Sequence, residues 1–234
     1  MDKLGLVLVP GLLCDAMLWR AQVESLSDIT EMWIPDHTRS DTMADVARDV
    51  LKDAPFKEFA LAGLSMGGYI SLEIMRQAPQ RVRRLALLDT AARADTPEQT
   101  EKRRAFIELA ERGKFMGVTE TLMPLLVHPS RLSEKPLTDA IRQMAANVGK
   151  DGFIRQQRAI MSRADSRPLL SMIKCPTLVL CGRQDQLTPL ERHEEMAAGI
   201  QGAKLEVLEE CGHMSTMERP ELVNRALHQW LTLD

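Results

Sequence analysis

The sequence predicts an α/β protein with a doubly wound, mostly parallel sheet of about six strands. Two observations lead to this fold class. Short apolar runs rich in Val, Leu and Ile recur along the 234 residues, and their continuous hydrophobicity indicates strands that are buried on both faces. Amphipathic stretches with helical spacing separate most of these runs, and strands that alternate with helices form βαβ units and a parallel sheet.

Each expected element follows from a local pattern. The apolar runs expected to form strands lie at residues 4–9, 31–35, 58–62, 84–88, 177–181 and 204–208. The amphipathic stretches expected to form helices between them lie at residues 17–25, 43–51, 68–78, 189–199 and 220–231. Pro189 and Pro220 stand at the start of the last two, the first helical position, where the missing N–H of proline breaks no hydrogen bond.

The alternation breaks once, between residues 93 and 170. This stretch shows no strand pattern, but it carries helical patterns at 97–112 and 137–148. It is too long to be a plain loop and must have structure of its own. The sequence therefore predicts a core domain formed by residues 1–92 and 171–234, with a helical lid inserted at 93–170.

Composition narrows the range of functions. Hydrophobic residues make up 44% of the chain and the net charge is −3, values typical of a soluble globular protein that binds neither nucleic acid nor an anionic membrane. No apolar run could span a bilayer, and no secretory signal is evident. The four cysteines form no CxxC pair and have no zinc-like spacing with histidine, so we expect reduced thiols, no metal site and a cytoplasmic location.

The strongest local signal is the pentapeptide Gly63-Leu64-Ser65-Met66-Gly67, which fits G-x-S-x-G. It follows an expected strand and precedes an expected helix, the context of a nucleophile elbow. The two glycines leave room for neighbouring backbone, and the helix N-terminus supplies N–H groups to a developing negative charge. A tight strand-to-helix turn without catalytic function is the alternative interpretation.

A nucleophilic serine needs a base and an acid that orients the base. His213 has the best setting, because it follows the last expected strand, and Asp185 follows the preceding one. Parallel neighbouring strands bring both residues to the carboxyl edge of the sheet, where Ser65 also lies. Asp89, after the fourth expected strand, is the second choice for the acid. The remaining histidines are expected to be solvated or to have packing roles: His37, His128, His193 and His228.

An oxyanion hole would complete the site. One donor is expected to be the N–H of Met66, which follows the nucleophile, and the other an N–H of the loop after the first strand. In that loop Gly11 allows a tight turn and Leu12 is the expected donor. Cys14 could lie close enough to make activity sensitive to thiol reagents, although simple burial is the favoured interpretation.

Together these motifs resemble the α/β-hydrolase family over nearly the whole chain. The matching segments are Pro10-Gly11 with Trp19, residues 63–68, residues 182–189 and residues 212–220. The last two resemble the acid and histidine loops of the small, single-lid branch, which includes enol-lactonases, C–C bond hydrolases, cofactor-free haloperoxidases and carboxylesterases. Two features depart from the family pattern: Pro10 replaces the usual histidine, and the first two strands of the larger sheet are missing.

The resemblance implies a serine hydrolase that cleaves a carboxylic ester, thioester or lactone through an acyl-enzyme, with Ser65, His213 and Asp185 as its triad. No nucleotide-binding motif is found, so no cofactor is expected. The expected partner is a small-molecule substrate, and the sequence indicates no oligomeric state. The alternatives are C–C bond hydrolysis, perhydrolysis or acyl transfer on the same residues, a slow-turnover receptor, and a non-enzymatic interaction protein.

The stretch 93–170 is expected to decide the substrate. Its apolar residues could form a ceiling over the site or merely pack together: Met116, Leu122, Met123, Leu125, Leu126, Phe153 and Met161. Four polar residues could reach a substrate, but the favoured expectation is that they are solvated: Gln156, Gln157, Arg163 and Arg167.

Overall fold

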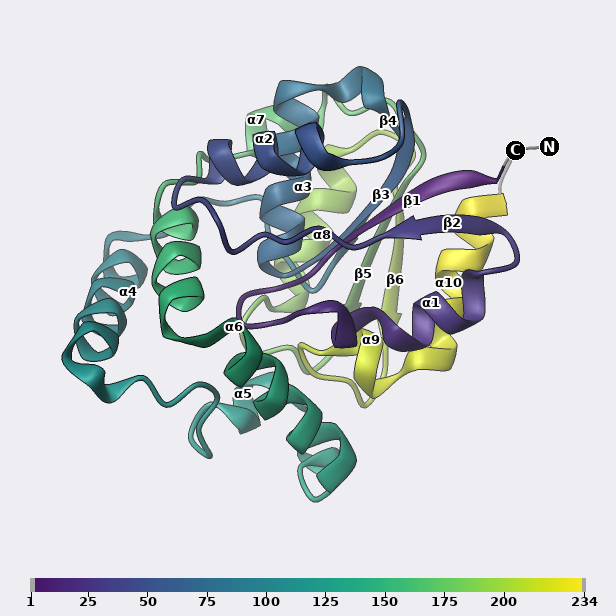
Figure 1. Ribbon diagram of the computed structural model, residues 1–234. Coiled ribbons are helices and arrows are strands. Elements are labelled where there is room, and N and C mark those ends of the chain that lie inside the picture. Colours follow the sequence, from purple (N-terminus) through teal and green to yellow (C-terminus); the bar gives the residue numbers. More distant parts are fainter. Residues whose placement is uncertain (1–2, 233–234) are drawn as a thin grey trace.

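A computed structural model describes residues 3–232 and shows one six-stranded parallel sheet (Figure 1). The strand order is β2-β1-β3-β4-β5-β6, and every neighbouring pair is parallel. The strands are β1 (Leu4–Val9), β2 (Thr30–Trp33), β3 (Phe59–Leu64), β4 (Val82–Leu88), β5 (Thr177–Gly182) and β6 (Lys204–Leu208). The predicted fold class is confirmed. The expected core domain also includes residues 1–2 and 233–234, which lie outside the described residues.

The sheet separates two apolar cores. Successive residues of a strand point to opposite faces, so Leu6 and Leu8 of β1 enter one core while Val7 and Val9 enter the other. On the first face pack α1 (Arg20–Leu26) and α10 (Pro220–Thr232). On the other face pack α2 (Met43–Asp53), α3 (Met66–Gln77) and α8 (Leu190–Gly199) (Figure 1). Because both faces are covered, the central strands need the continuous apolar runs seen in the sequence.

The chain between β4 and β5 is helical, and the described residues contain no strand there. Its helices are α4 (Pro97–Leu109), α5 (Met123–Leu126), α6 (Lys135–Met161) and α7 (Arg167–Leu170). Helices α4, α5 and α6 lie together at one end of the sheet, coloured teal and green in Figure 1, whereas α7 packs against α8. We call residues 93–170 the helical segment.

Several boundaries differ from the sequence prediction. The helix expected at 137–148 is longer in the structure and reaches Met161. The chain bends at Gly149 (φ 67°) and then resumes its helical course. The helix expected at 17–25 is a 3₁₀ turn (Ala16–Trp19) followed by α1. Pro220 opens α10 as expected, whereas Pro189 is the residue just before α8. None of the described helices is both long and apolar enough to cross a membrane.

Candidate active site

Ser65 lies in a strained turn between β3 and α3, with φ 56° and ψ −116°. A side chain on Gly63 would come within 2.2 Å of the carbonyl oxygen of Gly67, and one on Gly67 within 2.1 Å of the carbonyl oxygen of Val9. Backbone atoms cannot yield at such distances, so both glycines are required by the close approach of neighbouring chain. The turn holds the serine at the end of the central strand β3, where the helix begins.

The structure brings together the three side chains that the sequence singles out. The Oγ of Ser65 lies 2.8 Å from Nε2 of His213, and Nδ1 of His213 lies 2.8 Å from Oδ2 of Asp185. His213 follows β6, and its backbone N–H donates to the carbonyl of Leu126 in α5 (2.9 Å). Three loops after three different strands thus form one continuous row of hydrogen bonds.

Asp185 is itself held in place by the loop that follows β5. Its Oδ1 accepts hydrogen bonds from the N–H groups of Leu187 and Thr188, both at 2.9 Å, and its Oδ2 accepts from the Thr188 hydroxyl at 2.6 Å. Burial raises the pKa of Asp185, but the neighbouring His213 and the Thr188 donors outweigh burial and lower it below 3.8. The carboxylate is therefore ionised and pre-oriented toward the imidazole.

His213 is buried, and its surroundings favour the protonated ring. Burial lowers the pKa of this imidazole, but the charge and hydrogen bond of Asp185, with smaller effects from Asp89 and Glu218, raise it above 6.5. An imidazole that is stabilised when it gains a proton suits a group that must accept one from a hydroxyl.

The loop after β1 lies against the serine. A side chain on Gly11 would come within 3.4 Å of Cβ of Ser65, so the next residue, Leu12, is close to the same point. None of the described residues accepts a hydrogen bond from the N–H of Leu12 or of Met66. The residue after Gly11 and the residue after Ser65 therefore each carry a backbone N–H that is free to bind another acceptor.

A side chain of the helical segment supports this loop, and sequence reasoning missed its role. Leu13 takes the left-handed conformation (φ 58°), and its N–H donates to Oε1 of Gln156 at 3.0 Å. The amide Nε2 of Gln156 lies 2.9 Å from Nε2 of His37, which is also 3.0 Å from the carbonyl oxygen of Gly11. Gln156 is completely buried, so the expectation that it is solvated is wrong.

Asp89, the second choice for the acid, has other partners. Its Oδ1 accepts from the N–H of Gly182 (3.0 Å), and its Oδ2 accepts from the hydroxyl and the N–H of Ser215. Burial, together with the charge of Asp185, raises the pKa of Asp89 well above 3.8. Asp89 therefore joins the ends of β4 and β5 to the histidine loop, while Asp185 is the carboxylate that contacts the imidazole.

Glu218 is a second residue whose role the sequence does not reveal. Its Oε1 accepts from the N–H groups of Gly212 and Met214, on either side of His213, and its Oε2 accepts from the N–H of His128. Burial raises the pKa of this carboxyl above 4.5 despite these three donors. One side chain thus fixes the histidine loop to the helical segment.

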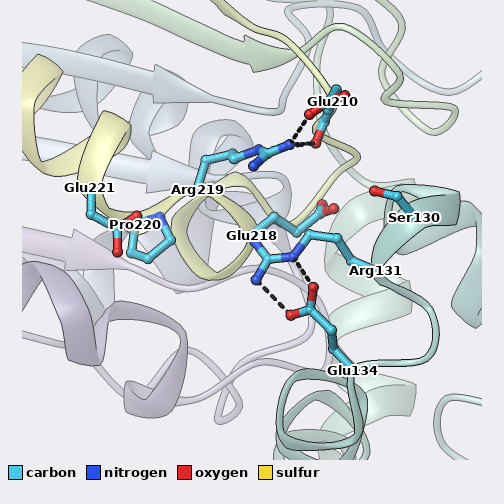
Figure 2. A pocket seen from close by; sticks show the side chains of 8 residues that line it. All are labelled: Ser130, Arg131, Glu134, Glu210, Glu218, Arg219, Pro220 and Glu221. Atoms are coloured by element: carbon cyan, nitrogen blue, oxygen red, sulfur yellow. Dashed lines mark hydrogen bonds and ion pairs between the residues drawn. The ribbon is translucent and has the colours of Figure 1, made fainter.

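Figure 2 shows the surroundings of Glu218. Its side chain lies in a small polar depression between two ion pairs, Arg219 with Glu210 and Arg131 with Glu134. Both arginines already bond to glutamates, at 2.9 and 2.7 Å. The Arg219–Glu210 ion pair lies on the outer side of the histidine loop, and the Arg131–Glu134 ion pair lies on the facing part of the helical segment.

A cavity of about 590 Å³ opens onto Ser65 and His213. Its apolar lining comes largely from the helical segment and includes five of the expected ceiling residues: Met116, Leu122, Leu125, Leu126 and Phe153. Met123 and Met161 are not among the lining residues. Cys14 also lines the cavity, and burial raises the pKa of its thiol to about 12, so the thiol stays protonated.

One part of the cavity wall is polar. Gln157 and Arg163 line it, and both are largely buried, which contradicts the expectation that they are solvated. Arg103 of α4 joins them, a residue that no sequence pattern singles out. Arg167 instead bonds to Asp165 at the surface, as expected for a solvated side chain.

Comparison with known proteins identifies the family. The profile of the alpha/beta hydrolase fold matches residues 6–220, and a match over most of the chain settles membership. The chain belongs to the α/β-hydrolase family and is a hydrolase.

Similar proteins have several activities. A protein of Agrobacterium fabrum provisionally named carbamate hydrolase RutD is 26% identical over 97% of this chain and 92% of its own length. The 2-hydroxy-6-oxo-6-phenylhexa-2,4-dienoate hydrolase of Comamonas testosteroni is 26% identical over 85% of this chain and 70% of its own. The malate-bound structure of a thermophilic esterase from Thermogutta terrifontis is 32% identical, with a TM-score of 0.90, covering 98% of this chain and 90% of that one.

Proposed function

We propose that the protein is a serine hydrolase that cleaves a carboxylic ester, thioester or lactone through an acyl-enzyme intermediate. One observation carries this proposal. Two hydrogen bonds of 2.8 Å each join Ser65 Oγ to His213 and His213 to Asp185, at the floor of a cavity large enough for a small molecule. The similarity to the T. terrifontis esterase adds support.

In the proposed mechanism His213 Nε2 accepts the hydroxyl proton of Ser65 as the oxygen attacks the substrate carbonyl. Asp185 holds the proton of Nδ1 and stabilises the imidazolium that forms. His213 then returns its proton to the leaving oxygen or sulfur, and the alcohol or thiol departs. A water molecule, deprotonated by the same imidazole, attacks the acyl-enzyme and releases the acid together with free Ser65.

The tetrahedral oxyanion is proposed to accept hydrogen bonds from the N–H groups of Leu12 and Met66. Both flank the serine and both lack an acceptor among the described residues. A backbone or side-chain donor in such a position contributes about 3 kcal/mol to transition-state stabilisation. Gln156 is proposed to keep the first donor in place through its bond to Leu13.

The helical segment is proposed to act as a lid over this site, as residues 93–170 are expected to do. Its residues supply most of the apolar cavity lining, which favours a small or medium substrate with an apolar body. The T. terrifontis esterase has been solved with malate bound, so a relative of this chain can hold a small carboxylate.

C–C bond hydrolysis by the same three residues is the second candidate. The similarity to the Comamonas dienoate hydrolase favours it. Perhydrolysis, acyl transfer and slow-turnover binding use the same geometry, so reactivity has to separate them. A substrate panel of p-nitrophenyl esters, thioesters, lactones and vinylogous diketones makes that separation.

The decisive experiment combines this panel with Ser65→Ala. We expect turnover of p-nitrophenyl esters by the wild-type protein and a loss of several orders of magnitude in the variant. Ser25→Ala, on the exposed surface of α1, is the matched control and should retain full activity. Unchanged ester turnover by a correctly folded Ser65→Ala protein would refute the proposal.

A further inference from the structure

The charged side chains that line the cavity have one sign. Arg103, Lys114 and Arg163 line it, and none of its described lining residues is Asp or Glu. Apart from His213, the rest of the lining is neutral and mostly apolar. An excess of positive charge inside an apolar cavity attracts a ligand with a negative group.

Arg103 and Arg163 are held in fixed positions on either side of Asp95. The Nε of Arg103 donates to Asp95 at 2.6 Å and its Nη1 donates to Gln157 at 2.8 Å. Arg163 contacts Asp95 through Nη2 at 2.7 Å. The exposed fractions of these side chains are 20% for Arg103, 8% for Arg163 and 2% for Asp95. Guanidinium groups this ordered lose little freedom when a ligand binds.

The group has one positive charge in excess, because two guanidinium groups share a single carboxylate. Each guanidinium has five N–H donors. Three donors of Arg103 bond to Asp95 and Gln157, and three of Arg163 bond to Asp95 and two backbone carbonyls. Two N–H donors of each arginine therefore have no acceptor among residues 3–232. Their planar arrangement fits the two oxygens of a carboxylate.

Arg163 is linked to the proposed nucleophile through Tyr69, and both arginines line the same cavity as Ser65. Tyr69 follows Ser65 by one turn of α3, about 6 Å along the helix axis, and also lines the cavity. Cζ of Arg163 lies 4.3 Å from the centre of the Tyr69 ring. A short substrate whose carbonyl is at Ser65 can therefore place its other end beside the guanidinium groups.

We propose that the substrate carries a carboxylate, separated from its scissile carbonyl by a short apolar chain, which binds to Arg103 and Arg163. This inference rests on the proposed ester hydrolysis and names its substrate class. The single excess charge of the group formed by Arg103, Arg163 and Asp95 matches one carboxylate. A purely structural tie between the two ends of the helical segment, near Asp95 and Arg163, is the competing explanation.

The test compares two esters of equal chain length. Mono-p-nitrophenyl glutarate has a free carboxylate at the end of its acyl chain, and p-nitrophenyl pentanoate has a methyl group there. We expect the wild-type kcat/KM to be about 10- to 100-fold higher for the glutarate, the ratio expected for a hydrogen bond between charged groups. Added salt should reduce this preference, a readout that needs no variant.

Arg103→Gln should remove most of the preference by raising KM for the glutarate, with a change of less than about threefold for the pentanoate. Arg104→Gln is the matched control, since Arg104 is exposed and its one partner among the described residues is Glu101. If Arg103→Gln lowers kcat/KM equally on both esters, Arg103 only holds the helical segment together, and the proposal is overturned. So would a wild-type protein that cleaves both esters equally well.

A binding measurement separates this inference from the hydrolase proposal. Calorimetric titration of Ser65→Ala with monomethyl glutarate should show at least about tenfold tighter binding than with dimethyl glutarate. If the wild-type protein hydrolyses no ester but Ser65→Ala shows this difference in affinity, ester hydrolysis is refuted and the carboxylate site is supported. Equal affinities would overturn the site even if neutral esters are hydrolysed.

Discussion

The loops after β1, β3, β5 and β6 form the floor of the cavity, whereas the helical segment forms its roof. In the floor, backbone constraints decide each position: Gly67 cannot carry a side chain, and Asp185 accepts three local hydrogen bonds. The roof contains a π-helical turn (Ala110–Lys114) and a bend at Gly149. It also exposes large apolar side chains, with Met116 at 76% and Phe106 at 45%.

This difference separates two tasks. The floor fixes Ser65, His213 and Asp185 by short hydrogen bonds, and the proposed chemistry requires such fixed positions. The proposed role of the roof is to enclose a substrate and to present a positive charge to it, a role that tolerates looser packing. Changes in the floor should therefore affect rate and folding, and changes in the roof should affect the choice of substrate.

The largest expected effect distinguishes the two buried aspartates of the floor. Asp185→Asn should lower kcat for ester hydrolysis by about 10⁴, because an amide no longer fixes the correct imidazole tautomer. Asp89→Asn should cost far less, because Asp89 does not contact the imidazole and its amide oxygen keeps one of the two sets of donors, Gly182 or Ser215. Steady-state kinetics on one ester compares kcat of the two variants. A larger loss for Asp89→Asn than for Asp185→Asn would contradict the choice of Asp185 as the acid of the triad.

Glycine substitutions should distinguish floor from roof by stability. In Gly67→Ala the new methyl group would clash with the backbone of Val9, so we expect a loss of about 3 kcal/mol in the free energy of unfolding. In Gly113→Ala in the roof the new methyl group meets no atom of the described part of the chain within 4 Å and adds only the strain of a positive φ, about 1 kcal/mol. Urea denaturation measures the free energy of unfolding of both variants. Equal losses would contradict the expected difference between floor and roof.

The pH dependence of kcat/KM should be set by a single group of the floor, His213. The proposed base must be neutral, and its surroundings raise the pKa of His213 above 6.5. We therefore expect kcat/KM to fall about tenfold per pH unit below that pKa and to level off above it. Ester hydrolysis measured from about pH 5 to 9 tests this, and a midpoint below about 6 would argue against His213 as the base.

The smallest expected effect concerns the link between floor and roof. Glu218→Gln keeps an acceptor for Gly212 and Met214 but removes a negative charge near His213. We expect a few-fold loss of kcat and a shift of the pH midpoint to lower values, because this carboxylate raises the pKa of His213. A merely structural role would change kcat without moving the midpoint. Glu221→Gln, in the same depression, is the control.

The floor could be predicted because its constraints are local. Gly63 and Gly67 around Ser65 report a tight turn, and residues that follow parallel strands meet at one edge of the sheet. The four central strands were predictable because buried parallel strands are continuously apolar, whereas the edge strands β2 and β6 are partly exposed and show a weaker pattern. The sequence also favoured Asp185 over Asp89 by the position of their strands relative to the histidine loop, and Asp185 is the one that contacts His213.

The roof could not be predicted to the same extent because its contacts join residues far apart in the chain. Gln156 bonds to Leu13, 143 positions away, and Arg103 meets Gln157 across two helices. A long polar side chain on an amphipathic helix looks solvated until its neighbours are known. Glu218 presented the same difficulty, since its three partners are backbone N–H groups that no motif records.

The central claim is that Ser65 is an activated nucleophile, and covalent labelling tests it most directly. The wild-type protein, treated with a fluorophosphonate and digested for mass spectrometry, should carry the phosphonyl group on Ser65. Ser65→Ala should remain unlabelled, and Asp185→Asn should react much more slowly. Failure of the folded wild-type protein to react, or labelling at another residue, would contradict the account.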